Sequence, residues 1–293
     1  MCRVLHTGQD RPRAGVPLNP HDSQPALPTH MVGSLWTNRR LLAQMSKRDV
    51  IGRYKGAAMG MAWSFVTPML MLCVYTFVFS VVFQARWGGD LPDGKAHFAL
   101  IMFVGMLVHG LFSEVVNRAP MLILANPNYV KKVVFPLEIL PVMAMTSALF
   151  HAGVSALILL AGLLLLDGRI EWTFVFLPVV LAPLVVLTIG VGWFLAALGV
   201  YLRDVGQVTS ILTMVMLFLA PVFYPVTALP ADYRWVVNAN PLTFIIEQAR
   251  DVLIWGRMPD FAGLAVYLLV AILFACSGFF WFQKTRKGFA DVL

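Results

Sequence analysis

The first notable feature of this 293-residue chain is how little charge it carries. Only 13% of its residues are Asp, Glu, Lys or Arg, whereas 59% are hydrophobic. A soluble domain carries about 25% charged residues, so the composition excludes an ordinary soluble protein and indicates a membrane protein. Cysteine is also scarce. Cys2, Cys73 and Cys276 are far apart in the sequence, and this spacing predicts neither a disulfide framework nor a zinc site.

Six apolar stretches are long enough to cross a bilayer as helices, which takes about 20 residues each. They run over residues 59–84, 98–117, 137–166, 172–202, 208–228 and 261–282. The predicted fold class is therefore an all-α membrane protein with six transmembrane helices, which form one domain over residues 59–283.

Ionisable residues are nearly absent from the middle of these stretches. The exceptions are His109 and Glu114 in the second stretch and His151 in the third. A lone histidine in a helix bundle is usually hydrogen-bonded to a neighbouring helix. Proton relays and ion sites need intramembrane ionisable groups, so we predict no proton-coupled transport, no membrane-embedded hydrolysis and no metal site.

The distribution of positive charge predicts the orientation. If the amino terminus is cytoplasmic, sixteen of the 22 Lys and Arg residues lie on the cytoplasmic side, and the positive-inside rule then places both termini there. This asymmetry accounts for the net charge of +7 without nucleic acid as a partner. Residues 1–33, which are rich in proline and polar side chains, lack the apolar core of a signal peptide and are expected to form a flexible cytoplasmic tail.

One short segment resembles a nucleotide-binding loop. Gly89, Gly94 and Lys95 fit the first seven positions of G-x-x-x-x-G-K-[ST], but Ala96 replaces the hydroxyl residue that would hold Mg²⁺. The predicted topology also puts this segment outside the cell, next to two aspartates that would repel phosphate. We therefore expect no cofactor in this chain, and any ATP and Mg²⁺ to be bound by a partner subunit.

Three segments flank the predicted spans. Residues 34–58 mix basic and apolar side chains, which favours an interfacial amphipathic helix capped by Ser34, although Asp49 interrupts its apolar stripe; the alternative is a solvated basic lead-in. Near the outer side, Asn240 and Pro241 predict the start of a helix that ends by Gly256. At about 15 residues it rises about 22 Å, too short to cross, so it is expected to be re-entrant. Residues 284–293 are expected to form a cytoplasmic tail.

Aromatic residues supply candidate surfaces for a substrate. Tyr75, Phe79 and Phe83 recur every four residues on one helix face, and a second group lies near the outer end of the fifth stretch: Phe218, Phe223 and Tyr224. Aromatic faces of this kind stack on sugar rings, so these six residues are the candidate substrate path. The alternative is an interfacial aromatic belt or helix packing.

Four local sequences together resemble the permease subunits of ABC-2 type exporters of cell-surface polysaccharides. They are Arg48-Asp49 with Arg53-Tyr54-Lys55, Gly60, Trp63 and Pro68; KKVVFPLEILP at 131–141; Arg203-Asp204; and PVFYPVTALPADYRWVVNANPLTFIIEQARDVLIWG at 221–256. The resemblance covers about residues 34–285. Leu137 departs from it, since an arginine is expected before the glutamate.

The resemblance implies a homodimer in the bacterial inner membrane with two copies of a separate ATPase subunit. The substrate would be a lipid-linked polysaccharide such as O-antigen, capsule or teichoic acid, exported from the cytoplasm. By position, the residues that contact the ATPase would be Asn128, Tyr129, Val130, Lys131, Lys132, Arg203 and Asp204. The short outer helices would gate the exit with Tyr233, Trp235, Glu247 and Arg250. An ABC-2 permease for a drug or lipid and a membrane scaffold without transport activity remain as alternatives.

Overall fold

The computed structural model describes residues 28–78, 94–131 and 135–293, and in these residues it is helical without a strand. This confirms the predicted all-α class. The α-helices are α1 (Pro28–Thr37), α2 (Arg39–Tyr54), α3 (Trp63–Tyr75), α4 (Gly94–Arg118), α5 (Pro127–Lys131), α6 (Ile139–Asp167), α7 (Leu177–Tyr201), α8 (Val205–Leu219), α9 (Arg234–Asn238), α10 (Pro241–Leu253), α11 (Phe261–Thr285) and α12 (Phe289–Val292). Short 3-10 turns adjoin several of them: η1 (Gly60–Ala62), η3 (Ala119–Met121), η4 (Trp172–Phe176), η5 (Val226–Ala228), η6 (Ala231–Tyr233) and η7 (Arg286–Gly288).

Five helical stretches of the described chain are long and apolar enough to cross a membrane, which makes this a multi-pass membrane protein. They are Gly60–Val78, Phe98–Met121, Ile139–Leu166, Trp172–Tyr201 and Phe261–Val292. They match the first, second, third, fourth and sixth predicted stretches. Residues 79–84 of the first predicted stretch lie outside the described residues.

The fifth predicted stretch is shorter than expected. The sequence predicts a helix to residue 228, but α8 ends at Leu219, and Ala220 is extended with ψ 151°. Proline explains the difference, because Pro221 disfavours the helical conformation of the residue before it. Pro225 comes four residues later and bars the helix from resuming there. The 15 residues of α8 rise about 22 Å, less than the roughly 30 Å hydrocarbon core.

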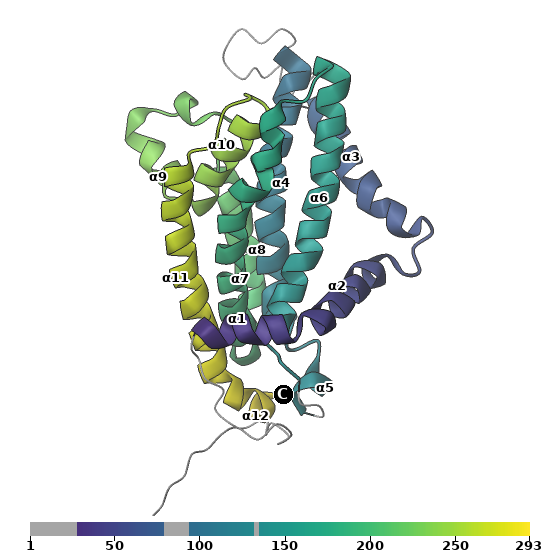
Figure 1. The fold of residues 1–293 in the computed structure, drawn as a ribbon, viewed down its shortest axis with the longest axis vertical. Helices are drawn as coiled ribbons and strands as arrows, with labels where there is room; N and C mark the ends of the chain where they lie inside the picture. The colour runs from purple at the N-terminus through teal and green to yellow at the C-terminus, as the bar shows by residue number, and fades with distance from the viewer. Residues whose placement is uncertain (1–27, 79–93, 132–134) are drawn as a thin grey trace, which may run out of the picture.

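The long helices form a bundle with α4 near its centre (Figure 1). In the most apolar part of the span that contains α4, 78% of the residues are buried inside the protein. In the span that contains α3, only 6% are buried. Within the described chain, the most extensive helix–helix contact is between α7 and α11, where small residues let the backbones meet. Gly190 and Gly278 face each other there, and a Cβ atom on Gly190 would lie 2.6 Å from the Cα of Ala275. Small residues at such crossings are the usual way that membrane helices pack tightly.

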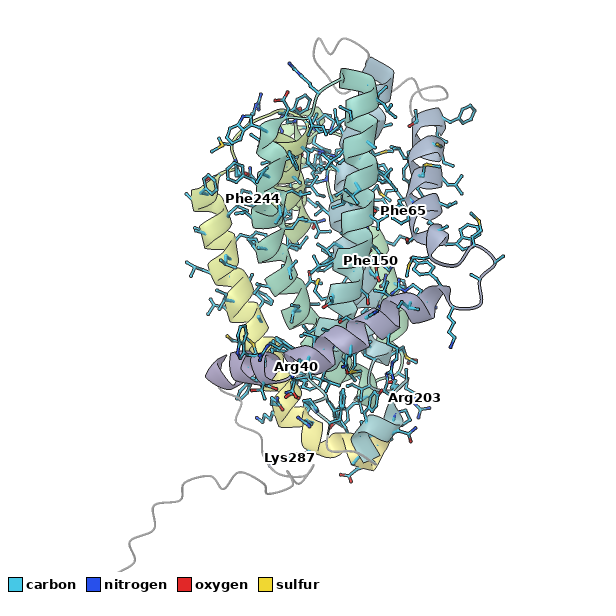
Figure 2. The ribbon with its side chains drawn as sticks, turned by 45° about the vertical axis from the view of Figure 1, so that its right-hand side comes forward. Arg40, Phe65, Phe150, Arg203, Phe244 and Lys287 are labelled. Atoms are coloured by element: carbon cyan, nitrogen blue, oxygen red, sulfur yellow. The ribbon has the colours of Figure 1, made fainter. Side chains whose placement is uncertain are left out.

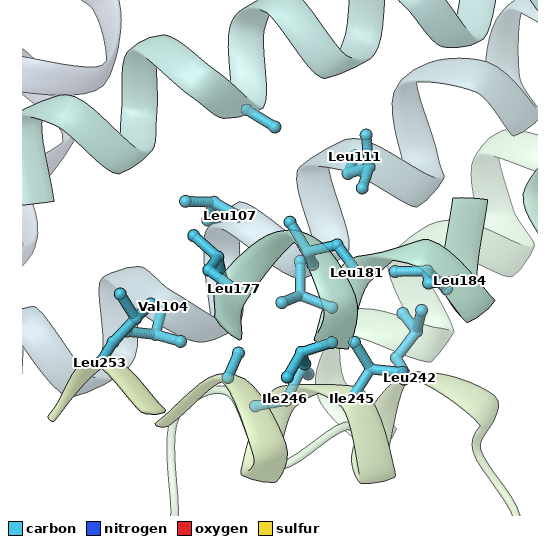
Figure 3. Packing of buried hydrophobic residues seen from close by; sticks show 14 of the residues in the cluster. Val104, Leu107, Leu111, Leu177, Leu181, Leu184, Leu242, Ile245, Ile246 and Leu253 are labelled. Carbon is cyan, nitrogen blue, oxygen red and sulfur yellow. The ribbon is translucent and has the colours of Figure 1, made fainter. Parts of the chain in front are cut away.

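The two ends of the bundle differ. We call them the α5 end, where α1, α2, α5 and α12 lie, and the α10 end, where α9 and α10 lie (Figure 1). At the α10 end, the apolar face of α10 packs against α4 and the start of α7 (Figure 3). Ile245, Ala249, Val252 and Leu253 are buried, as predicted, in the same core cluster as Val104. Asn240 caps α10 as predicted, since its side chain accepts from Leu242 N.

Three terminal features differ from the sequence prediction. The first helix begins at Pro28 within the predicted flexible tail, and a turn at Asn38 divides the interfacial segment into α1 and α2. Ser34 is not a cap, because it lies inside α1 and its hydroxyl donates to Glu138. Residues 284–293 are helical and Phe289 is fully buried, because its ring packs against aromatic side chains of the bundle.

Candidate functional site

The two segments predicted to contact an ATPase lie at the same end of the bundle. One contains α5, and the other is the turn between α7 and α8, which carries Arg203 and Asp204. Figure 2 shows Arg203 at the α5 end, the same end at which Lys287 lies. Asn128, Arg203 and Asp204 are exposed there. Lys131 is the last residue of α5, and Lys132 lies outside the described residues.

The other predicted coupling residues hold α5 in place. Val130 is buried, and the half-buried ring of Tyr129 stacks on Phe135 with 4.4 Å between ring centroids. Arg48 of α2 donates to the Tyr129 hydroxyl at 2.8 Å. A five-residue helix is not stable alone, so these contacts are what position it. The surface that α5 offers to a partner therefore includes Asn128, while Tyr129 and Val130 face the protein.

A carboxylate joins α2 to two helices of the bundle. Arg118 of α4 donates to both Asp49 oxygens, at 2.8 and 2.9 Å, and the Ser147 hydroxyl of α6 donates to Asp49 at 2.6 Å. This explains why Asp49 interrupts the apolar stripe of its helix: it occupies the face toward the bundle, where its charge is paired. The sequence pattern gave the position of the irregularity, but it could not identify the partner.

A second carboxylate extends this link along α2. Glu114 of α4 pairs with Arg53 at 2.7 Å and with His151 Nδ1 of α6 at 2.9 Å. The Tyr54 hydroxyl lies 3.0 Å from His151 Nε2, and burial raises the pKa of Tyr54, so the phenol stays protonated and can donate to that nitrogen. His109 likewise donates to the Thr213 carbonyl oxygen at 2.9 Å. Both histidines are hydrogen-bonded to other helices, as predicted.

These ion pairs line a cavity of about 710 Å³ between α2 and α4. Its lining residues are Arg48, Asp49, Gly52, Arg53, Glu114, Asn117 and Arg118. Both carboxylates are already paired with arginines, so neither is placed as a general base. Within the described part of the chain, no group of three or more His, Cys, Asp or Glu residues could hold a metal ion. The side chains around this cavity connect α2 to α4 and α6 and hold the helices together.

A third carboxylate, which sequence reasoning did not single out, joins four elements at the α5 end. Glu138 accepts from Ser34 of α1 at 2.7 Å and from Arg286 of η7 at 3.0 Å. Its backbone oxygen accepts from the Trp193 indole of α7 at 2.9 Å. The available signal was a glutamate beside Pro136 at the start of an apolar stretch.

At the α10 end, Arg250 is fully buried and fixes α10 to its surroundings. Its guanidinium donates to Glu247 at 2.7 Å, to the Ile101 carbonyl oxygen of α4 at 3.3 Å and to the Val222 carbonyl oxygen at 3.2 Å. Burial lowers the pKa of Arg250 to about 10, which leaves it charged at neutral pH. The predicted gate residue is thus a clamp between α10, α4 and the segment after α8.

The remaining predicted residues are not all together. Tyr233 ends η6 and Trp235 lies in α9, and both side chains are exposed, whereas that of Arg250 is fully buried. Phe218 and Phe223 lie 5.7 Å apart between ring centroids, and Tyr224 donates to the Phe218 carbonyl oxygen at 2.9 Å. A separate element carries Tyr75, which is half-buried at the end of α3. Phe79 and Phe83 lie outside the described residues, so the aromatic stripe stays a prediction.

Comparison with known proteins gives a consistent set of relatives. Residues 40–254 match the family model of the ABC-2 type transporter. The chain is 26% identical over 263 residues to the O-antigen export system permease protein RfbA of Myxococcus xanthus, covering 89% of this chain and 98% of the relative. It is 23% identical over 255 residues to the protein of the same name from Klebsiella pneumoniae, covering 86% and 95%. Its identity to the polysialic acid transport protein KpsM of Escherichia coli is 23% over 233 residues, covering 77% and 86%.

Proposed function

Because the chain belongs to the ABC-2 type transporter family, a family of membrane permeases, we propose that it is the transmembrane subunit of an ATP-driven polysaccharide exporter. In this proposal the cargo is a lipid-linked polysaccharide such as O-antigen, which moves from the cytoplasm across the bacterial inner membrane. The observation that carries the proposal is the relation to permeases of polysaccharide export over most of the chain. Family membership implies an ATPase partner, which hydrolyses ATP in place of this transport subunit.

The arrangement at the α5 end supports a docking face for that partner. Asn128 and Arg203 are exposed at this end on two separate short segments, and the charge asymmetry of the sequence makes this the cytoplasmic side. A soluble motor can reach only such surfaces. The hydrogen bond from Arg48 to the Tyr129 hydroxyl ties α5 to α2, and Asp49 ties α2 to Arg118 of α4 and Ser147 of α6. A push on α5 therefore has a rigid route to α4 and α6.

We further propose that two copies of the chain assemble with two ATPase subunits. The apolar faces of α3 and α8 are available for this contact within one copy. More than half of the surface of each of these side chains is exposed: Met69 and Leu70 of α3, and Ile211, Met214 and Phe218 of α8. A second copy would bury these faces and enclose a route for a polymer. The clamped α10 lies at the opposite end from the docking face (Figure 1), which is where an exit gate would act.

Co-purification of the permease with an ATPase subunit from the same organism tests the partner. Reversing the charge at Lys131 and Lys132 to Glu should remove the ATPase from the purified complex while the permease still inserts. Arg40→Glu is the matched control, since Arg40 is exposed on α2 at the same end. Unchanged subunit stoichiometry together with unchanged coupled ATPase activity in the double variant would refute the assigned docking face.

A strain that lacks the permease tests the cargo. The proposal predicts that surface polysaccharide disappears, that lipid-linked polymer accumulates in the cytoplasm, and that the wild-type chain restores export. If surface polysaccharide stays normal while drug resistance or lipid distribution changes, the substrate class is wrong even though the protein is a transporter. If neither changes and no ATPase co-purifies, the chain acts as a scaffold.

A further inference from the structure

The last ten residues, 284–293, occupy a place that an unstructured tail would not. They leave α11, pass through η7 and end in α12, which lies against both α5 and α7 (Figure 1). We call residues 284–293 the C-terminal bridge. The bridge therefore contacts α5, which is the first segment assigned to the ATPase, and the helix that leads into the second segment, the turn after α7.

The first anchor of the bridge is Arg286. Its guanidinium donates to the Glu138 carboxylate at 3.0 Å and to the Phe135 carbonyl oxygen at 2.9 Å. Both charged side chains are largely buried, with 13% and 8% of their surface exposed. Phe135 is also the ring on which Tyr129 of α5 stacks. Arg286 therefore holds the segment that positions α5.

The second anchor is aromatic. Phe289 is fully buried, and its ring centroid lies 5.6 Å from that of Phe282 and 6.1 Å from that of Tyr201. The Tyr201 hydroxyl donates to the Thr285 carbonyl oxygen at 2.8 Å. Tyr201 is the last residue of α7 and precedes Arg203 by two positions. The bridge therefore also fixes the start of the second coupling turn.

We propose that the C-terminal bridge fixes the spacing between the two ATPase-contacting segments, with Arg286 and Phe289 as positioning residues. The inference rests on the proposed function, because it needs the ATPase partner. A motor that closes against two independent loops would displace each one separately, and part of its movement would be lost. With both loops joined to one buried segment, the push reaches the bundle as a single displacement.

The test uses the full-length permease purified with its ATPase and reconstituted in liposomes with lipid-linked polymer. Three quantities are measured: bound ATPase per permease, ATP hydrolysis rate, and polymer exported per ATP hydrolysed. Arg286→Glu should keep the ATPase bound but lower export per ATP about tenfold, the scale of a broken buried coupling. Arg40→Glu, the same charge reversal on an exposed residue, should leave all three unchanged.

Rescue distinguishes positioning from simple destabilisation. The double variant Glu138→Arg with Arg286→Glu restores an opposite-charge pair, so export per ATP should return to within about threefold of wild type. Phe289→Leu, which keeps a large apolar side chain, should retain more coupling than Phe289→Ala. If Arg286→Glu fails to insert, Arg286→Gln, which keeps a donor for the Phe135 oxygen, serves as the single variant.

The outcomes separate this inference from the proposed function. A wild-type chain that neither binds the ATPase nor exports polymer overturns the proposed function. A wild-type complex that works, combined with Arg286 and Phe289 variants whose export per ATP equals that of wild type, overturns the bridge alone. Equal losses of hydrolysis and export, with an unchanged ratio, also overturn it, because they would show that the segment only stabilises the fold.

Discussion

Replacing Asp49 with Asn should release α2 from the bundle. Asp49 accepts three hydrogen bonds, two from Arg118 and one from Ser147. Asparagine keeps one acceptor oxygen but loses the charge, so Arg118 is left facing an uncharged group. The second carboxylate near Arg118 is that of Glu114, whose oxygen lies 3.7 Å from an Arg118 nitrogen. It is already paired with Arg53 at 2.7 Å.

The expected cost follows from how far the pair is buried. The Arg118 and Asp49 side chains are 28% and 20% exposed, between a surface ion pair, worth about 0–1 kcal/mol, and a buried one, whose breakage costs about 3–5 kcal/mol. We therefore expect about 2 kcal/mol in the free energy that holds α2 against α4 and α6. This corresponds to about a 30-fold change in the equilibrium for local detachment.

Hydrogen exchange of the α2 amides in lipid nanodiscs measures this equilibrium. In Asp49→Asn the amides of α2 should exchange about 30-fold faster, while those of α7 stay as in wild type. Lys47→Ala, on the exposed side of the same helix, should change nothing. Ser147→Ala should have a smaller effect, about 1 kcal/mol, because it removes one donor and leaves the ion pair.

An unchanged exchange rate in Asp49→Asn would refute the reasoning. It would show that the ion pair contributes no more than a surface pair, and that the buried side chains of Met45 and Val50 hold α2 by themselves. Faster exchange throughout the protein would also contradict it, because the pair would then stabilise the whole fold and not the α2 joint.

Three further substitutions test other parts of the molecule. Gly199→Ala should lower stability by about 1–3 kcal/mol in thermal unfolding, because the added methyl group meets the backbone of Pro120. Gly206→Ala, where the space is open, should not lower stability. Equal melting temperatures for the two variants would contradict the packing of Gly199 against Pro120. Arg250→Met should speed hydrogen exchange in α10 and reduce export, because the carbonyl oxygens of Ile101 and Val222 lose their donor. Normal hydrogen exchange and normal export would show that the Arg250 contacts are dispensable. Lys95→Ala, in the first turn of α4, should leave export intact, and a large loss would mean that Lys95 contributes to transport.

The sequence predicted the elements that depend on length and composition alone. Five of the six apolar stretches became long helices close to their predicted bounds, because an apolar run of 20 or more residues has few other solutions in a membrane. The predicted end of α8 at residue 228 was wrong, because Pro221 forces Ala220 out of the helical conformation. The cap of α10 followed from Asn240 and Pro241 in the same local way.

Partners between elements could not be predicted. Arg118 lies 69 residues from Asp49, and Arg286 lies 148 residues from Glu138. Nothing in the local pattern of either residue identifies the other, because only the packing of the bundle brings them together. The same holds for α5, where the inward orientation of Val130 depends on the core beneath it.

The positions of the ion pairs also indicate where charged contacts between elements are tolerated. Asp49, Glu114 and Glu138 each pair with an arginine of another element, and all three pairs lie at the α5 end. There, water can replace a broken pair at a cost of a few kcal/mol, whereas an exposed charge in the hydrocarbon region would cost more. Contacts within the bundle are instead mostly apolar, such as the Gly190–Gly278 crossing, where close backbones leave little freedom to shift. Movement driven from the α5 end should therefore pass from α5 through α2 and these ion pairs to a bundle that moves as one body.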